Sequence, residues 1–147
     1  MTMNSKAKKK AVNRAVRAQA RVAEKLLKQV HEFAEPAFRE TKSAAAIAAY
    51  LAERGFTVTF PWKRIPTAFR AVRGKGRPAI GILGEYDALP NCGKDEGTWG
   101  HGCGHDLLGV GAAAGAVAAA ELLSRRRGKS GQVIYYGCPA EETLAGK

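Results

Sequence analysis

Apolar residues recur along the chain with two spacings, and the changes between them divide it into elements. Between residues 11 and 33 they return every three or four positions, which predicts a helix with one buried side. A second helix is expected at 44–54, with Thr41 as a candidate N-cap and Gly55 just past its end. A third, rich in Ala, Leu and Val, is expected at 107–125, where three glycines permit close packing against a sheet.

Shorter stretches have the patterns expected of strands, and they lie at residues 56–60, 67–73, 79–84 and 132–137. The run at 79–84 is almost continuously apolar, as expected of a central strand covered on both faces. The segment Arg126-Arg127-Gly128 is expected to break the third helix before the last strand. Because strands alternate with helices, the pattern predicts an α/β domain with a largely parallel sheet.

Composition fits a soluble globular domain, and its charge is concentrated at one end. The 147 residues carry a net charge of +11, from 24 basic and 13 acidic side chains. Nine of the basic residues precede His31, where Glu24 is the only acid. Residues 1–10 are predicted to be a disordered basic tail. The cationic face of the helix that follows could bind nucleic acid or a membrane surface, but a solvated helix face is the favoured interpretation and neither is the expected partner.

Cysteine usage and hydropathy bear on the compartment. Three cysteines without a Cys-x-x-Cys pair do not form a disulfide framework, which suits a reducing environment. We see no apolar run of about 18 residues or more and no signal peptide. The expectation is therefore a cytoplasmic protein that does not interact with membranes.

The stretch from Gly100 to Asp106, which reads GHGCGHD, contains the candidate chemistry. A Cys thiolate and a neutral imidazole are good ligands for zinc and similar metals. Residues two apart in an extended segment point to the same side, so Cys103 and His105 can face one site. A lone cysteine or histidine is usually explained by packing, whereas this cluster favours a metal site if carboxylates complete it.

Carboxylates follow two of the predicted strands. Glu85 and Asp87 come after the strand at 79–84, and Glu141 and Glu142 come after the last one. If these strands are parallel neighbours, all four side chains share one sheet edge, where ligands bind in α/β folds. Such a cluster suits a hydrolytic site with one or two metals, in which one glutamate binds metal and the other acts as general base. Taken alone, an acidic pair more often lies in a solvent-exposed surface loop, and Asp87 could be a turn residue.

Three strings resemble metallopeptidase family twenty, in its amidohydrolase branch: GEYDALP (84–90), GHGCGHDLLG (100–109) and YGCPAEE (136–142). The segments HEFAEPAFRETKSA and IPTAFRAVRGKGRP also resemble that branch, so the likeness covers nearly everything after Val30 and excludes the basic tail. The resemblance implies a three-layer, zinc-peptidase-like catalytic domain with helices on both faces of the sheet.

The resemblance also implies roles for individual residues. Cys103, His105 and Glu142 would be metal ligands, Glu141 the general base, and Asp87 the group that orients the histidine ligand. The metal would be manganese or zinc, with two ions in the complete enzyme. The reaction would be hydrolysis of an amide bond in N-acyl amino acids, such as p-aminobenzoyl-glutamate-like compounds, or in small dipeptides.

Two further residues belong to the motifs without a definite role. Glu85 stands where other branches place a metal-binding histidine, and His101 is expected at most to support the ligands. Members of the family are considerably longer and contribute more histidine ligands. We therefore expect residues 11–147 to be the N-terminal part of a catalytic domain that is incomplete at its C-terminus. Alone it is predicted to be almost inactive and to bind metal weakly, and the full-length protein could be a homo- or hetero-oligomer.

Two alternatives come from other classes of function. One is a non-catalytic basic module that binds RNA or acidic partners through residues 6–28. The other is a structural zinc site built from Cys92, Cys103, His105 and Cys138. The irregular spacing of these four disfavours it, because structural zinc sites usually draw on closely spaced pairs of ligands.

Overall fold

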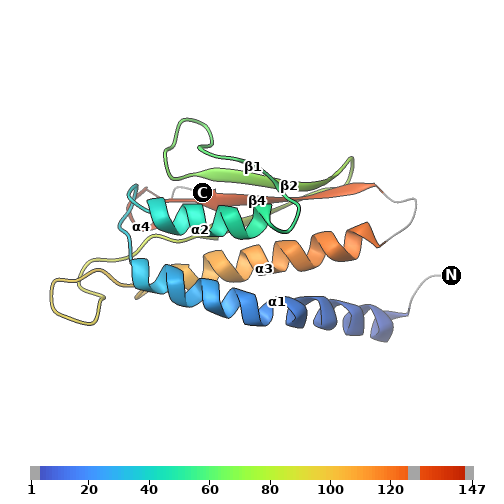
Figure 1. Ribbon diagram of the computed structural model, residues 1–147, viewed down its shortest axis with the longest axis horizontal. Coiled ribbons are helices and arrows are strands. Elements are labelled where there is room, and N and C mark those ends of the chain that lie inside the picture. The colour runs from blue at the N-terminus through green and yellow to red at the C-terminus, as the bar shows by residue number, and fades with distance from the viewer. Residues whose placement is uncertain (1–3, 126–129, 145–147) are drawn as a thin grey trace.

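Helices and strands follow one another along residues 4–125 and 130–144, the parts of the chain that the structure, a computed structural model, describes (Figure 1). The elements are α1 (Ser5–Phe33), α2 (Thr41–Ala52), β1 (Thr57–Thr59), β2 (Phe69–Lys75), β3 (Ala79–Glu85), α3 (His105–Ser124), β4 (Gly131–Cys138) and α4 (Glu141–Leu144). The predicted helix break at 126–128 and the first three residues of the predicted tail lie outside the described residues.

The first helix is longer than the sequence pattern indicated. It begins at Ser5, where the Asn4 side chain accepts a hydrogen bond of 2.8 Å from the backbone N–H of Ala7. This is the N-capping interaction that asparagine favours, and the lysines and alanines that follow are good helix formers. The prediction of a disordered tail is therefore wrong for residues 5–10.

The sheet is mixed, with strand order β1-β2-β4-β3. β3 and β4 are parallel, whereas β1–β2 and β2–β4 are antiparallel. A parallel pair needs a long crossover, and α3 provides one only between β3 and β4. The prediction of a largely parallel sheet is therefore wrong, although the single parallel pair is the one that positions the site.

The three long helices contribute to one core on one face of the sheet. That face carries Phe69 and Ala71 from β2 and Val133 and Tyr135 from β4, all in one buried cluster with residues of α1, α2 and α3. On the opposite face Leu83 is 49% exposed. Among the described residues the long helices therefore cover only one face of the sheet, and the prediction of helices on both faces is not met.

The apolar strand β3 lies at the edge of the described sheet, and its pattern had predicted a central, covered strand. Ile80 is 54% exposed there. The expectation of full coverage on both faces is therefore wrong for this part of the chain. An apolar run indicates that a strand is able to bury both of its faces. In the described residues, however, β3 packs only against β4 and α3.

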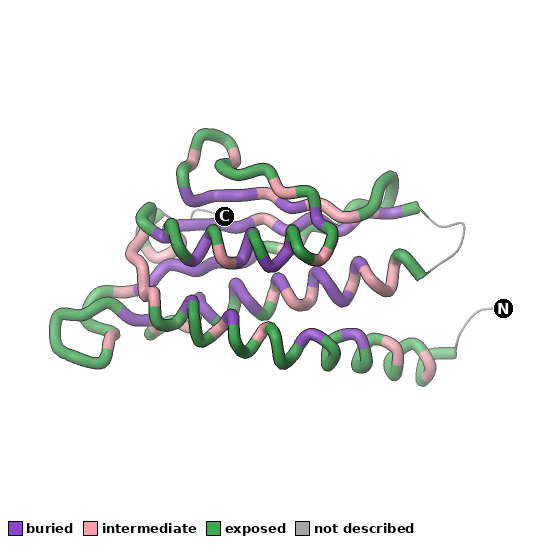
Figure 2. The backbone as a smooth tube through the Cα atoms, viewed as in Figure 1, coloured by how far each residue is buried: buried purple, intermediate pink, exposed green. Residues whose placement is uncertain are grey.

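Helix α3 is the central helix of the fold. By length and composition it is apolar enough to cross a membrane, so the expectation that no such run exists was wrong. In the structure it packs against β3 and β4 and against α1, which accounts for its apolar character (Figures 1 and 2). A side chain at Gly109 would meet the backbone oxygen of Glu85, whereas Gly111 and Gly115 face open space. Only the first of the three glycines therefore serves close packing.

Candidate metal centre

Three segments that are distant in sequence meet at one edge of the sheet: the end of β3, the start of α3 and the start of α4. In the parallel register Glu85 is paired with Cys138, so β3 and β4 end side by side. This confirms the prediction that the loops after these strands share an edge. α3 begins at His105, directly after the glycine-rich motif, and therefore brings that motif to the same place.

His105 is the centre of the cluster. Its side chain is buried, and its Nδ1 lies 2.8 Å from Oδ1 of Asp87. Since a carboxylate only accepts hydrogen bonds, Nδ1 carries the proton and donates it to Asp87. The other ring nitrogen, Nε2, then offers its lone pair, which is the arrangement that metal-binding histidines usually have.

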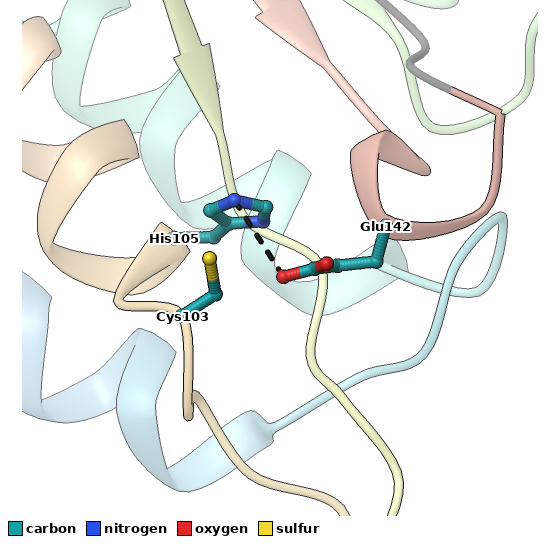
Figure 3. A group of neighbouring side chains, drawn as sticks. All are labelled: Cys103, His105 and Glu142. Atoms are coloured by element: carbon teal, nitrogen blue, oxygen red, sulfur yellow. Dashed lines mark ion pairs between the residues drawn. The ribbon is translucent and has the colours of Figure 1, made fainter.

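Carboxylates surround that second nitrogen. Oε2 of Glu85 lies 3.3 Å from Nε2 of His105, and one oxygen each of Glu141 and Glu142 lies at 3.7 Å. Figure 3 shows the His105 ring and the Glu142 carboxylate turned toward each other, with the Cys103 sulfur beside them. So many acidic oxygens around one imidazole form a cation-binding environment.

Asp87 couples two parts of this cluster. Its Oδ1 accepts from the His105 ring, and its Oδ2 accepts a 2.9 Å hydrogen bond from the backbone N–H of Glu142. The Asp87 side chain is almost completely buried, at 1% exposure. It therefore fixes the histidine ring and the start of α4 relative to each other.

Two sets of potential ligand atoms result, each with its members within 4.8 Å of one another. One set contains Cys103, His105 and Glu142, and the other contains Glu85, His105 and Glu141. Oε1 of Glu142 is buried and has no hydrogen-bond partner among the described residues, as expected of an oxygen that serves as a metal ligand. A thiol, an imidazole and carboxylates suit zinc, manganese or cobalt, so these residues fit a divalent metal.

The thiol of Cys103 is exposed and lies next to the carboxylates. A hydrogen bond with Glu142 and its negative charge raise the pKa of Cys103, and the charges of Glu141 and Glu85 add to this. These groups disfavour a bare thiolate at this position. A bound cation acts in the opposite direction, because metal coordination deprotonates a thiol.

The structure brings together Cys103, His105, Glu142, Glu141 and Asp87, the five residues for which the sequence predicted roles. Their individual roles stay predictions, since proximity alone does not distinguish a ligand from a base.

Glu85 is more central than the sequence suggested, because it is buried and belongs to the second set of ligand atoms. The sequence feature that indicated this position was a carboxylate directly after the apolar run at 79–84, in the segment before the histidine motif.

Other histidines support the centre from outside. Nδ1 of His31 lies 2.7 Å from Oδ2 of Asp106, a hydrogen bond that joins the last turn of α1 to the first turn of α3. His101 contacts the Val30 carbonyl through Nε2 at 3.3 Å, and burial lowers the pKa of His101. Sequence reasoning missed the first contact, because nothing local links residues 75 positions apart.

The geometry does not support a structural zinc site. Neither Cys92 nor Cys138 belongs to a set of potential ligand atoms in the described parts of the chain. Cys92 is exposed, and the Cys138 thiol instead donates a weak hydrogen bond of 3.5 Å to the Tyr136 carbonyl.

A cleft of about 600 Å³ opens beside Glu142. Its walls are mostly apolar and include Phe38, Leu89 and Trp99. Phe38 and Trp99 remain 44% and 42% exposed, so both rings are available to a bound molecule.

Comparison with known proteins gives the following relatives, and no family model matches the chain. Over 129 residues it is 43% identical to one of the subunits of p-aminobenzoyl-glutamate hydrolase from Escherichia coli, a match that covers 81% of this chain and 27% of that protein. Over 93 residues it is 41% identical to Xaa-Arg dipeptidase of Mus musculus, covering 56% of this chain and 20% of that protein.

A similar solved structure is a dinuclear metal-binding peptidase of the M20 family from Bacillus subtilis. The two chains superpose with a TM-score of 0.66 at 27% identity, over 88% of this chain and 38% of that one. The chain thus spans only a fifth to about a quarter of the length of the curated relatives named above.

Proposed function

This chain is a homologue of a p-aminobenzoyl-glutamate hydrolase subunit, with structural neighbours in metallopeptidase family twenty, and from this premise we propose that it forms part of a metal-dependent amide hydrolase. The observation that carries the proposal is the cluster around His105, where carboxylates and a thiol surround an imidazole that Asp87 orients.

The metal in this proposal is zinc or manganese, held by Cys103, His105 and Glu142, with two ions in the complete enzyme. These residues would hold a divalent ion, which would supply Lewis-acid polarisation of the amide carbonyl and a lowered pKa for the nucleophilic water. The solved neighbour described as a dinuclear metal-binding peptidase supports a divalent metal.

The protein's own groups do the rest of the chemistry. Glu141 takes the proton from the attacking water and later delivers it to the leaving amine, as a general base and then a general acid. Asp87 keeps the His105 ring oriented through its 2.8 Å hydrogen bond. The apolar cleft next to Glu142 would receive the acyl side of the substrate, which fits an aromatic N-acyl amino acid or a small dipeptide.

We further propose that the 147-residue chain has little hydrolase activity by itself and binds metal weakly. Both sets of potential ligand atoms use His105, and its Nδ1 is engaged by Asp87. One remaining lone pair cannot serve two metals, so the described residues complete at most one three-ligand site. The full protein would then draw further ligands from the larger part that its relatives have, and it could act within a hetero-oligomer.

A chimera tests both statements. This chain would replace the matching 129-residue segment of the Escherichia coli relative, and turnover of p-aminobenzoyl-glutamate would be followed with added manganese or zinc. We expect activity in the chimera and almost none in the isolated chain. Turnover by the isolated chain would contradict the incomplete site.

In the active chimera, Glu141→Gln should lower kcat by about 10²- to 10⁴-fold, on the order found for general bases. Glu142→Gln should mainly weaken metal binding. Glu96→Gln, at an exposed loop position, is the matched control and should change neither quantity. Full activity of the Glu141 variant would remove the basis of the proposed mechanism.

A further inference from the structure

A line of cationic side chains, which we call the cationic stripe, runs along one side of α1. It consists of Lys10, Arg14, Arg17, Arg21, Lys25 and Lys28, all of them exposed. They are spaced three or four residues apart, so they fall within about 80° of the helix circumference at about 100° per residue. With a rise of about 1.5 Å per residue, the stripe is about 27 Å long.

The rest of the helix fixes the direction in which the stripe points. Ala15, Gln19, Leu26 and Val30 are the buried residues of α1, and the helix packs against α3 on that side. The stripe occupies the opposite side, which is exposed along the helix (Figure 2). Between residues 10 and 28 the only acid is Glu24, which pairs with Lys28 at 2.9 Å.

We propose that the cationic stripe binds the phosphodiester backbone of a nucleic acid duplex. A duplex presents about one negative charge per 1.7 Å of its axis, so a straight row of cations about 27 Å long can meet phosphates along its whole length. Three of the six groups are arginines, whose planar guanidinium pairs with phosphate through two hydrogen bonds. Contacts of this kind are independent of base sequence.

The structure favours a nucleic acid over an anionic membrane. An interfacial helix inserts an apolar face into the lipid, and the apolar face of α1 is already packed against α3. The large apolar side chains that α1 exposes are Val12, Val16 and Val22, with no Trp, Phe or Leu among them. This helix could therefore bind a membrane only through charge contacts. Charge contacts alone are sufficient for binding to the backbone of a nucleic acid.

The stripe is separate from the metal centre. α1 approaches that centre at its last turn, where His31 contacts Asp106 and the Val30 carbonyl contacts His101. Nucleic acid binding would thus be an additional property that does not depend on amide hydrolysis.

Fluorescence anisotropy with labelled RNA and DNA duplexes of about 20 base pairs tests this proposal on the 147-residue chain. We expect a Kd of about 1–100 μM near physiological salt, the range of sequence-independent binding. Between about 50 and 200 mM salt, log Kobs should fall against log salt with a slope of about −4 to −5, for about five phosphates neutralised. Binding to either duplex supports the proposal, and a preference for one identifies the partner.

Matched triple variants locate the binding surface. Arg14→Gln, Arg17→Gln and Arg21→Gln together should reduce the slope by about 3 and weaken binding at least about tenfold at about 50 mM salt. Lys63→Gln, Lys75→Gln and Lys94→Gln remove the same charge from exposed positions outside α1 and should change the affinity less than about twofold. Replacing the three arginines with lysine should restore the slope, and circular dichroism should show the same helix content throughout.

Three outcomes would overturn the proposal. One is equal loss of binding in both glutamine variants, which would mean that only net charge matters. Another is an affinity that does not respond to salt. The third is tighter binding to vesicles of anionic phospholipid than to either duplex, which would make the stripe a membrane-surface contact.

Discussion

Asp87 shows how much of the metal centre depends on a residue that is in neither set of potential ligand atoms. It accepts from the ring N–H of His105 with one oxygen and from the backbone N–H of Glu142 with the other. In Asp87→Asn the amide NH₂ would face one of these donors, so one contact is lost and two N–H groups oppose each other. We expect metal affinity to fall by about 10- to 100-fold, as for other groups that orient ligands.

Calorimetric titration with zinc or manganese measures this change. Asp95→Asn is the control, since Asp95 lies in an exposed part of the loop before the metal motif. It should bind metal like the wild type. If Asp87→Asn also retains wild-type affinity, Asp87 does not orient the ligands.

Glu40 predicts a pH dependence of stability. Its carboxylate is fully buried and accepts hydrogen bonds of 2.8 Å from the Thr67 hydroxyl and from the backbone N–H of Ala140. Burial raises the pKa of Glu40 above its ordinary value of 4.5, although these hydrogen bonds oppose the shift. The folded state therefore holds this proton more tightly than the unfolded state, and the associated stability, complete below pH 4.5, is lost as the pH rises through the folded pKa.

Glu40→Gln cannot ionise and has nearly the same shape. We expect its free energy of unfolding to increase relative to that of the wild type as the pH is raised from 4.5 to about 8, because only the wild type loses stability over this range. Urea unfolding at several pH values measures both proteins. A difference that stays constant over this range would show that the carboxyl does not titrate on unfolding.

Local patterns predicted the residues of the site better than their partners. The glycine-rich spacing of Cys103 and His105 and the Glu141–Glu142 pair are short-range features, and these residues do lie together. The contact between His31 and Asp106 depends on how α1 crosses α3, and no local pattern encodes it. Site residues that lie within a short motif can thus be predicted from the sequence. The contacts that residues distant in sequence make with them cannot.

At the scale of elements, hydrophobic periodicity located the three long helices and the four strands, but neither the short helix α4 nor the neighbours of each strand. Whether two strands pair depends on the connections between them, and only α3 makes a parallel crossover. β1 and β2 are joined without a helix and pair antiparallel. A run of β and α patterns therefore overstated the parallel character of the sheet.

The packing of α3 against the end of β3 predicts opposite effects for two glycine substitutions. In Gly109→Ala the new methyl group would collide with the backbone oxygen of Glu85, so α3 must move away from β3. We expect a loss of about 1–3 kcal/mol of stability, as in other overpacked sites. Metal affinity should also fall, because His105 lies one turn earlier in the same helix.

Gly111→Ala is the matched control within α3. This position has nothing within 4 Å of an added methyl group and is exposed. Removing the flexibility of a helical glycine should stabilise the protein by about 0.5–1 kcal/mol. Urea unfolding compares the two variants, and equal effects would show that α3 does not approach β3 closely.

At the scale of the whole molecule, the metal centre brings together three segments that are distant in sequence. Ligand atoms come from the end of β3, the start of α3 and the start of α4, whose approach crowds several carboxylates around one imidazole. A divalent cation would offset this repulsion only in the folded state, because the unfolded chain does not hold these segments together. Metal binding should therefore stabilise the entire fold and not the site alone.

We expect zinc or manganese at about 100 times its Kd to add about 2.7 kcal/mol to the free energy of unfolding, whatever the value of Kd. For a chain of this size the melting temperature should rise by roughly 8 °C, and a chelator should reverse the change. Differential scanning calorimetry measures the shift. Cys103→Ala removes an exposed ligand without opening the core, so at the same metal concentration its shift should be smaller. An equal shift in this variant would mean that the metal stabilises the protein from another place.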